Sequence, residues 1–532
     1  MVVNLAGGGH FFLIPHYKTG RNRIRFLLRL LILFCRFHQN SMRYFSTFFL
    51  LSILLTASCK NTSENNTSET TSSEPEWISQ VGADDFEFNE KVFYVNDYDA
   101  IADGSALTTT AIQQAIDAAA ANGGGTVTFK PGTYLSGSIF IKENVHFNIP
   151  EGVAILGSES IEDYPEIDTR VAGIEMKWPA ALINVLDQKN VTIDGKGLVD
   201  GQGKVYWDYY WNLREEYEPK GLRWIVDYDA KRPRTFLLQN AENVFLKDLN
   251  IQRAGFWTVQ VLYSNHITVD GLTIRNNIGG HGPSTDGIDI DSSKYILVQN
   301  CDIDCNDDNF CLKAGRDWDG LRVDRPTEYV VIRDCIALAG SGLTTIGSET
   351  SGDIRHVFVS NIQGKGTKTG LKIKSATNRG GTVEDIHMQN IKMDSVGTFM
   401  EVSMNWNPSY SYSKLPEGYD YDSIPKRWKT LLEEVTPPEK GIPTFKDISI
   451  SNIEVQGAKR AIYVNGMETS TVSNIQLTDV HIAAQEAGQI TYSKDWILDN
   501  VSLNIADGST LTIENAPGVE FPNTLYIAND ED

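Results

Sequence analysis

The chain has 532 residues, a formal net charge of −22 and a hydrophobic fraction of 41%. That hydrophobic fraction is enough for a large packed core, so the composition indicates a globular protein. The negative charge excludes nucleic acid as a partner, because phosphate binding requires a basic surface. An acidic polymer could still bind, but only through a local cluster of positive side chains.

The N-terminal part of the chain has the layout of an export signal. Residues 42–58 contain one arginine, an apolar run too short to cross a membrane, and small residues before Cys59. The ending LTASC resembles a bacterial lipobox, which predicts lipidation of Cys59; the alternative is an ordinary signal whose cleavage site happens to contain a cysteine. We therefore expect an exported bacterial lipoprotein, periplasmic or at the outer membrane, that contacts the membrane only through its lipid anchor.

The residues on either side of this signal are not expected to fold. Residues 1–41 precede a complete signal, so we interpret them as a non-native upstream extension, with Met42 as the true start. Residues 59–80 contain the lipidation site and the polar, low-complexity run KNTSENNTSETTSSEP. That composition predicts a disordered tether.

Residues 81–532 are predicted to form one domain built from repeated β coils. Short runs of alternating apolar residues recur with a central Asn or Asp, and the spacing between these markers is 22 to 34 residues at Asp248, Asp270, Asn300, Asp334, Asn361 and Asn390. This spacing favours a parallel β-helix with variable loops over a β-sandwich, which would show a turn every 8–12 residues. Asn and Asp suit the turns because they tolerate the left-handed conformation. An alanine-rich helix over 108–121 is expected to cap the first coil.

Four cysteines lie in this body, at Cys301, Cys305, Cys311 and Cys335. Their spacing lacks the paired pattern of a zinc site, so no metal is predicted from them. They are either buried thiols, which we favour, or one or two disulfides.

An acidic stretch, STDGIDIDSSKYILVQNCDIDCNDDNFCLKAG, surrounds three of these cysteines. It begins like an EF-hand loop at Asp302, but Asp307 and Lys313 stand where that loop needs glycine and glutamate, which excludes this calcium site. A second group of aspartates alternates with isoleucines on strands, so we expect its members to point outward into solvent: Asp289, Asp291, Asp302 and Asp304.

The remaining aspartates, Asp286, Asp307 and Asp308, stand at strand edges. Asp286 and Asp307 are separated by 21 residues, about one coil, so they should lie on adjacent rungs about 4.8 Å apart. Repulsion between neighbouring carboxylates raises the pKa of at least one, and a proton donor beside ionised bases is the requirement of glycoside hydrolysis. From the residues alone, catalysis and turn formation remain equally open.

Four blocks that follow one another in the chain resemble glycoside hydrolase family 28, the polygalacturonases and their relatives. The family pattern is Asn-Thr-Asp, Asp-Asp, Gly-His-Gly and Arg-Ile-Lys. Here the blocks read Ser284-Thr285-Asp286, Asp307-Asp308, Gly340-Ser341-Gly342 and Lys372-Ile373-Lys374. The segment VFYVNDYDAIADG with the alanine-rich helix is also similar, so the resemblance covers most of residues 90–515.

The resemblance implies an all-β, single-stranded right-handed parallel β-helix that hydrolyses α-galacturonosidic bonds in pectin-type polysaccharide of plant cell walls. It implies that Asp307 is the general acid and that Asp286 and Asp308 activate a water, with inversion at the anomeric carbon. Lys372 and Lys374 share a strand face, and by the resemblance they bind a galacturonate carboxylate. No cofactor and no metal are predicted, and a monomer is expected.

Two positions depart from the family pattern. Ser341 stands where polygalacturonases carry histidine, and Lys372 stands where they carry arginine, whose bidentate grip lysine cannot match. Because of both departures, an enzyme of the same family that acts on rhamnogalacturonan is the alternative prediction. A separate Gly-His-Gly at Gly280-His281-Gly282 precedes Asp286 and cannot be the third block, so His281 is interpreted as a loop residue.

Aromatic side chains gather in two segments that interrupt or flank the coils. In residues 405–445 they could stack on sugar rings or pack the loop, and the same two explanations apply to KVYWDYYWNL; the candidates are Trp406, Tyr410, Tyr412, Trp428, Trp207, Tyr209, Tyr210 and Trp211. Two further functions fit a β-helix: a pectate-lyase-type enzyme using calcium, and a non-catalytic glycan-binding protein. The ordered acidic blocks favour hydrolysis.

Overall fold

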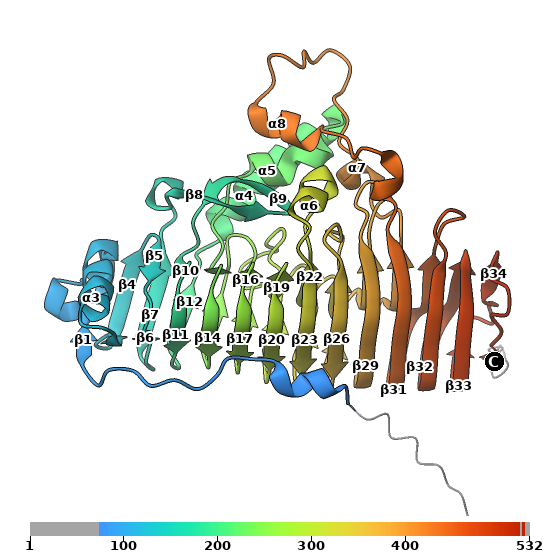
Figure 1. The fold of residues 1–532 in the computed structure, drawn as a ribbon, viewed down its shortest axis with the longest axis horizontal. Helices are drawn as coiled ribbons and strands as arrows, with labels where there is room; N and C mark the ends of the chain where they lie inside the picture. Colours follow the sequence, from blue (N-terminus) through green and yellow to red (C-terminus); the bar gives the residue numbers. More distant parts are fainter. Residues whose placement is uncertain (1–73, 522–523, 527–532) are drawn as a thin grey trace, which may run out of the picture. The chain divides into compact units, whose positions relative to one another are not determined.

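Three stacks of short parallel strands run through the part of the chain described by the computed structural model, residues 74–521 and 524–526. A typical coil passes once through each stack, and Figure 1 shows the coils side by side along the long axis. Sheet I contains β5 (Ile139–Ile141), β10 (Ile183–Leu186), β13 (Phe236–Gln239), β16 (Val259–Leu262), β19 (Ile288–Asp291), β22 (Phe310–Lys313), β25 (Thr344–Ile346), β28 (Thr369–Lys374) and β30 (Thr398–Ser403), followed by parts of β31 (Thr444–Asn465) and β32 (Val472–Thr491) and by β34 (Thr512–Glu514).

Sheets II and III repeat the same order, and long strands near the C-terminus bend from one sheet into the next. Sheet II contains β1 (Val92–Tyr94), β3 (Gly125–Thr128), β6 (Val145–Asn148), β11 (Lys189–Asp194), β14 (Glu242–Lys247), β17 (Asn265–Asp270), β20 (Lys294–Gln299), β23 (Thr327–Arg333), β26 (Ile354–Ser360) and the first parts of β29 (Thr382–Asp394), β31, β32 and β33 (Ser493–Ile505). Sheet III contains β2 (Asp103–Leu107), β4 (Gly132–Ser136), β7 (Val153–Gly157), β12 (Leu198–Asp200), β15 (Asn250–Gln252), β18 (Thr273–Arg275), β21 (Asp302–Asp304), β24 (Ile336–Leu338), β27 (Gln363–Lys365), later parts of β29 and β31 to β33, and β35 (Thr524–Tyr526).

The core lies inside the coils, where one apolar side chain from each rung stacks on the next. In sheet I, one such column is fully buried and in register: Val261, Ile290, Leu312, Ile346, Ile373 and Val402. Because side chains alternate along a strand, the same register places an outward column beside it. This outward column will carry the site.

The marker residues turn the chain as predicted, with one correction. Asp248, Asn300 and Asn361 have φ of 62°, 55° and 57°, in the left-handed region that Asn and Asp tolerate. On the rung of Asp270, however, the left-handed residue is the next one, Gly271, at φ 68°. Side chains of these turns also bond from coil to coil, as Asn361 Nδ2 donates to Asp334 Oδ1 at 3.0 Å.

A helix covers the N-terminal end of the core, as the alanine-rich stretch predicted. Helix α3 spans Thr109–Ala121, and its buried side chains include Ile112 and Ile116. It contacts β1, β3, β5 and β6, which belong to the first coils. The open end of a repeat stack would otherwise expose its apolar interior. The short 3-10 helices η2 (Val95–Tyr98) and η3 (Ile161–Asp163) lie in this N-terminal region of the chain.

Residues 74–90 form a strap along the outside of sheet II (Figure 1). Its 3-10 helix η1 (Glu76–Gln80) brings Trp77 edge-on to Tyr329 of β23, with ring centroids 5.6 Å apart. At the other end, Phe88 stacks on His146 of β6 at 5.4 Å. The predicted tether therefore ends too late, because residues 76–80 are helical and packed. The predicted extension, signal, Cys59 and the tether up to residue 73 lie outside the described residues.

Insertions between the coils form a lobe that packs over the outward face of sheet I and that Figure 1 shows projecting from one side of the molecule. We define the lobe as residues 166–179, 204–230, 317–323 and 405–441. It contains the antiparallel hairpin β8 (Glu166–Val171) and β9 (Ile174–Pro179) and the helices α4 (Lys204–Tyr217), η4 (Glu218–Lys220), η5 (Arg223–Ile225), α5 (Val226–Asp229), α6 (Asp317–Val323), α7 (Pro408–Ser411), α8 (Lys426–Leu431) and η6 (Pro438–Gly441).

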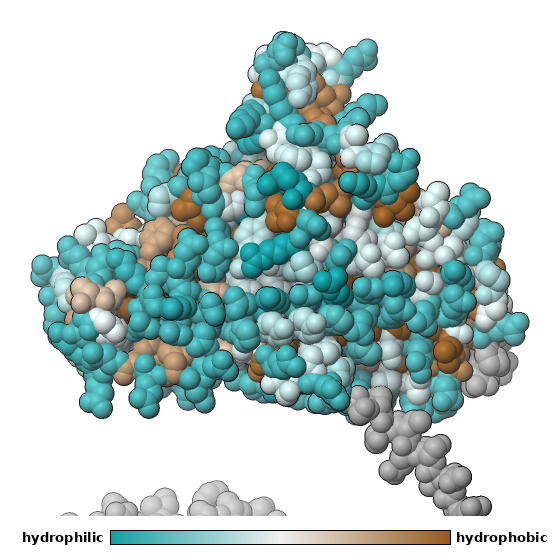
Figure 2. All heavy atoms as spheres, in the orientation of Figure 1, coloured by the Kyte–Doolittle hydropathy of each residue, from teal (hydrophilic) through white to brown (hydrophobic). Residues whose placement is uncertain are grey.

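The lobe has its own apolar core, separate from that of the coils. Trp178, Trp224 and Trp428 are buried in it, and they rest on Phe256 and Trp257 of the coil beneath. Of the two explanations offered for the aromatic residues of 405–445, packing of the loop therefore applies to Trp428. The face in Figure 2 is largely hydrophilic, with small, separate hydrophobic patches. Within the described residues, no helix is both long and apolar enough to cross a membrane.

Candidate active site

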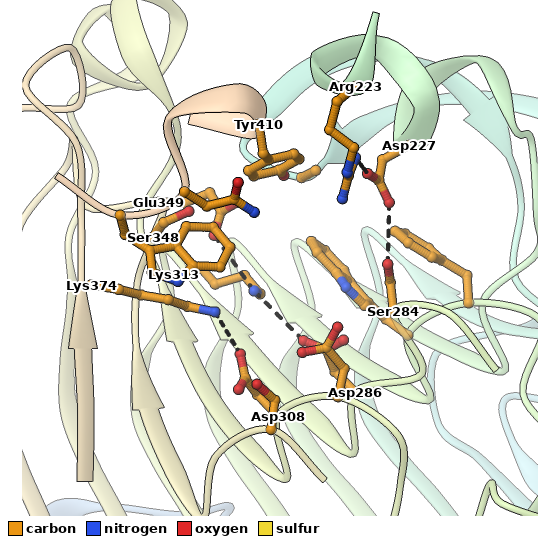
Figure 3. A pocket seen from close by; sticks show the side chains of 17 residues that line it. Arg223, Asp227, Ser284, Asp286, Asp308, Lys313, Ser348, Glu349, Lys374 and Tyr410 are labelled. Atoms are coloured by element: carbon orange, nitrogen blue, oxygen red, sulfur yellow. Dashed lines mark hydrogen bonds and ion pairs between the residues drawn. The ribbon is translucent and has the colours of Figure 1, made fainter. Parts of the chain in front are cut away.

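Three aspartates meet where the strands of sheet I begin. Asp286 precedes β19 and Asp308 precedes β22, and the backbone N–H of Gly287 donates to the carbonyl of Asp308 at 2.9 Å. Carboxylate oxygens of Asp286 and Asp308 lie within 4.8 Å of each other. The predicted placement on adjacent rungs is therefore confirmed, and Asp307 adjoins the pair in sequence. Asp286 and Asp308 are almost fully buried at the bottom of a pocket (Figure 3).

The turn that presents Asp307 and Asp308 is held by its neighbours. Asn309 follows the pair and donates from Nδ2 to the carbonyls of Ala339 and Gly342, both at 3.0 Å. Gly340 on that next rung has φ of 84°, and a Cβ there would lie 2.5 Å from the carbonyl oxygen of Asp307. The glycines of the third block therefore serve the close approach of two coils.

The two predicted lysines lie beside these aspartates. Both project from β28 on the outward face, and the Lys374 ammonium donates to Asp308 Oδ2 at 2.8 Å (Figure 3). The Lys372 ammonium donates to Ser341 Oγ at 2.9 Å. Both ammonium groups also face the Trp406 ring, at 5.9 Å for Lys372 and 4.5 Å for Lys374. The structure thus brings all five predicted residues to one place.

The surroundings shift the pKa values of the neighbouring carboxyls Asp307 and Asp308 in opposite directions. Burial and the Asp308 charge raise the pKa of Asp307 above its ordinary value. Burial acts on Asp308 too, but Lys374, Lys372 and Lys313 outweigh it and hold the pKa of Asp308 well below its ordinary value. Asp307 therefore keeps its proton at a pH where Asp308 is ionised.

The third carboxyl, Asp286, lies in more acidic surroundings. Burial, followed by the charges of Asp289 and Asp307, raises the pKa of Asp286 well above its ordinary value. Burial likewise raises the pKa of Asp289 to about 8, although the Lys313 ammonium lies 3.5 Å from its carboxylate. Since fewer cations than carboxylates face this pair, the pair holds a proton near neutral pH.

Lys313 and Glu349 belong to the site although the sequence did not single them out. The Lys313 ammonium lies 3.7 Å from Asp286, 3.5 Å from Asp289 and 3.5 Å from Glu349, and 4.8 Å over the Trp257 ring. Lys313 ends β22 and points outward on the same face as Lys374. Its position on the outward face of a strand next to the aspartates could have identified Lys313 from the sequence. Glu349 follows β25 in an irregular turn, for which no sequence pattern was available.

The expectation that Asp289 and Asp291 are solvated is wrong. Both point away from the coil interior, as predicted, but both are fully buried because the lobe covers this part of sheet I. Asp291 accepts from Arg170 Nη1 of the β8–β9 hairpin at 2.9 Å. Asp302 and Asp304, on sheet III, are partly exposed and agree better with the expectation.

The pocket has a volume of about 210 Å³ and is lined by both coils and lobe. The coils supply the aspartates, Lys313, Lys374 and Trp257, and the lobe supplies Arg223, Asp227, Trp406, Asn407 and Tyr410. Of the predicted aromatic candidates, Trp406 and Tyr410 therefore reach the pocket. Trp207 and Tyr210 lie on the buried face of α4, Tyr209 and Trp211 on the same helix are exposed, and the Tyr412 hydroxyl donates to Asn405 Oδ1 at 2.6 Å. His281 is an exposed loop residue whose carbonyl accepts from Trp211.

The donor atoms in the pocket do not favour a metal. Asp286, Asp308 and Cys311 could converge on one ion. However, lysine ammonium groups already pair with both carboxylates, and burial raises the pKa of the Cys311 thiol, which disfavours the thiolate ligand. All four body cysteines are buried free thiols, as favoured from the sequence.

Comparison with known proteins decides the family. The family model described as glycosyl hydrolases family 28 matches residues 149–418. The chain belongs to glycosyl hydrolase family 28. This family 28 enzyme is 27% identical to a probable polygalacturonase of Vitis vinifera, over 69% of this chain and 74% of the relative. It is 24% identical to an exo-poly-alpha-D-galacturonosidase of Dickeya chrysanthemi, over 79% of this chain and 75% of the relative.

Solved structures confirm the predicted fold. The hyperthermoactive exopolygalacturonase from Thermotoga maritima matches with a TM-score of 0.66 and 23% identity, covering 80% of this chain and 94% of that one. The family 28 exopolygalacturonase of Yersinia enterocolitica matches with a TM-score of 0.66 and 22% identity, covering 80% of this chain and 78% of the other. The chain is thus a right-handed parallel β-helix. Its membership of family 28 makes it a glycoside hydrolase.

The two departures from the family pattern touch each other in this family 28 enzyme. Ser341 replaces histidine and Lys372 replaces arginine, and the Lys372 ammonium donates to the Ser341 hydroxyl at 2.9 Å. Lysine keeps the positive charge at position 372 but lacks the planar guanidinium fork, and serine puts a hydroxyl at position 341 where the family pattern has an imidazole. The pair of substitutions therefore has to be treated as one change of local chemistry.

Proposed function

We propose that this family 28 enzyme hydrolyses α-galacturonosidic bonds in a pectin-type galacturonan with inversion of the anomeric configuration. The observation that carries the proposal is the meeting of Asp286, Asp307 and Asp308 in one pocket, where the surroundings raise the pKa of Asp307 and lower that of Asp308. A protonated acid next to an ionised base is what inverting hydrolysis needs. The polygalacturonase names of its relatives support the substrate.

In this proposal Asp307 donates its proton to the glycosidic oxygen as the bond breaks. A water held between Asp286 and Asp308 attacks the anomeric carbon from the opposite face and loses its proton to Asp308, the ionised member of the two. The approach of these carboxylates to within 4.8 Å suits one bridging water, since two hydrogen bonds of about 2.8 Å meeting at a water span such a gap. Asp286 positions this water.

Positive charge for an acidic substrate comes from the coils in spite of the net charge of the chain. Lys372 and Lys374 lie on one strand face beside Asp308, where a galacturonate carboxylate could bind next to the scissile bond. The Trp406 ring lies against both ammonium groups and offers a face to a sugar. Rhamnogalacturonan is not favoured as the substrate, because the relatives named above are polygalacturonases.

The test incubates the purified enzyme with polygalacturonate and, in parallel, with rhamnogalacturonan. We expect saturated galacturonate products from polygalacturonate only, and NMR of the first product should show the β anomer released from the α linkage. Cleavage of rhamnogalacturonan alone would assign the enzyme to the alternative substrate. Unsaturated products that disappear with a chelator would indicate a lyase, and no cleavage of either polymer would contradict hydrolysis.

The cellular location is a separate proposal that rests on the leader sequence. We propose export and attachment through lipidated Cys59, because residues 42–58 have the layout of a signal that ends at this cysteine. Labelled palmitate should enter the wild-type protein in a bacterial host and fail to enter Cys59→Ala. Equal labelling of both proteins would contradict the anchor.

A further inference from the structure

Two lobe segments that are far apart in sequence meet over the pocket. Helix η5 contributes Arg223 and helix α7 contributes Tyr410, and the Arg223 guanidinium lies 5.0 Å over the Tyr410 ring. Arg316 fastens both segments from below, because its guanidinium donates to the Tyr228 hydroxyl and to the carbonyl of Tyr410, each at 3.0 Å. The pocket is therefore roofed on the lobe side, which suits a chain end better than the middle of a long polymer.

The Arg223 guanidinium differs from the other cations that line the pocket. Lys374 pairs with Asp308, and Lys313 is shared among coil carboxylates. Arg223 pairs instead with Asp227, where its Nη1 donates at 2.8 Å (Figure 3). Asp227 has a second cation, the fully buried Arg232, whose Nη2 donates to Oδ1 at 3.3 Å. This cluster carries one more positive than negative charge.

The guanidinium also has donors to spare. Among the described residues, its hydrogen bonds run only from Nη1 to Asp227, so Nε and Nη2 are available to a ligand. The side chain is 12% exposed and borders the pocket. Two parallel donors on a planar fork match the two oxygens of a carboxylate, and partial burial strengthens that contact. Asp227 also accepts from Ser284 Oγ at 3.1 Å, which ties the cluster to the segment that carries Asp286.

We propose that Arg223 binds the carboxylate of the terminal uronate residue of a chain end that enters this pocket, so that the enzyme shortens its polymer from one end. The proposal rests on the proposed galacturonan hydrolysis and adds a specificity-determining residue to it. Arg223 reads the end of the chain, while Lys372 and Lys374 bind a carboxylate next to the catalytic aspartates. Recognition by Arg223 requires a free carboxylate on the terminal ring.

The experiment uses tetragalacturonate and two derivatives that carry a single methyl ester, one on each terminal residue. In the wild type we expect one of the two esters to lower kcat/KM by about 10- to 100-fold, because a charge-assisted bidentate contact is lost. In Arg223→Gln, the free acid should already be a poor substrate, and the same ester should cause little further loss. Arg223→Lys, which keeps the charge without the fork, should fall between the two.

The matched control is Arg214→Gln, an arginine of the same lobe that pairs with the exposed Glu218 on the surface. It should keep the wild-type preference for the free acid, and equal melting temperatures would show that the Arg223 variants are folded. On polygalacturonate, the wild type should release one product size from the first minutes. An early ladder of products, or an unchanged acid-to-ester ratio in Arg223→Gln, would overturn the inference while leaving galacturonan hydrolysis intact. Absence of any cleavage by the wild type would overturn both.

Discussion

The coils and the lobe differ in how they are built and in what they contribute. The coils repeat one rung, with in-register columns such as Ile290 on Leu312, and they supply Asp286, Asp307 and Asp308. The lobe collects four insertions around a separate tryptophan core and supplies the roof of the pocket. Under the proposals made above, the coils carry the chemistry, whereas the lobe determines which part of a polymer can reach it.

The strongest test of this division removes the proposed acid from the coils. Asp307→Asn should lower kcat by about 10³-fold, in the range expected for a lost general acid. The melting temperature should stay the same or rise, since a buried, like-charged carboxyl is replaced by a neutral amide. Asp304→Asn, on sheet III, is the control and should keep full activity. Similar activity in Asp307→Asn and the wild type would remove the carboxyl from the mechanism.

The second prediction concerns the two apolar cores. Trp428→Ala in the lobe and Ile303→Ala in the coils each empty a buried site, at a cost of about 2–5 kcal/mol. If the cores are independent, Ile303→Ala lowers the main calorimetric transition. Trp428→Ala should instead raise KM and open the lobe to proteolysis, with the main transition unmoved. An equal fall of the main transition in both variants would show that lobe and coils unfold together.

The third prediction uses pH to test the coil electrostatics. Lys374 helps to hold the pKa of Asp308 low against burial, so Lys374→Met should raise that pKa. Because protonated Asp308 cannot accept a proton from water, the acid limb of the kcat/KM profile should move to higher pH by about one unit or more. Lys365→Met, an exposed lysine on β27, is the control and should leave the profile unchanged. An unmoved acid limb in Lys374→Met would contradict the role of Asp308 as the base.

The smallest effect is expected at a coil turn far from the lobe. Asn361 has φ of 57°, and Asn361→Ala should cost about 1–2 kcal/mol of unfolding free energy from backbone strain. Asn361→Gly relieves the strain and loses only the exposed side-chain bonds, so chemical denaturation should rank it above the alanine variant. Activity should be the same in both. The reverse ranking would mean that the side-chain ladder, rather than the backbone, stabilises the turns.

The repeated coils could be predicted from the sequence, but the burial of coil residues beneath the lobe could not. The marker spacing predicted the coils, and the 21-residue interval correctly placed Asp286 and the Asp307-Asp308 pair on adjacent rungs. The burial of Asp289 and Asp291 was not predicted, because the covering residue Arg170 comes from a hairpin more than one hundred residues earlier. The alternation of residues along a strand predicts which face a side chain occupies, but it does not predict which distant segment covers that face.

The same reason explains the site residues that were missed. Lys313 and Glu349 come from different rungs and meet only because the coil register brings their turns together. Arg223 begins the short 3-10 helix η5, whose position depends on the tryptophan core of the lobe. No local sequence pattern predicts that these side chains reach one pocket, because their positions depend on contacts between the repeated coils and the irregular lobe.

The strap has a consequence for how the molecule unfolds. In a stack of coils each rung contacts only its neighbours, so such a stack tends to fray from its ends like a one-dimensional chain of weakly linked units. The strap contacts Tyr329 of β23 at one end and His146 of β6 at the other, so it spans several rungs at once. Because the strap contacts distant rungs, the unfolding of one rung weakens contacts that also stabilise the others. The stack therefore unfolds more cooperatively than nearest-neighbour packing alone would allow.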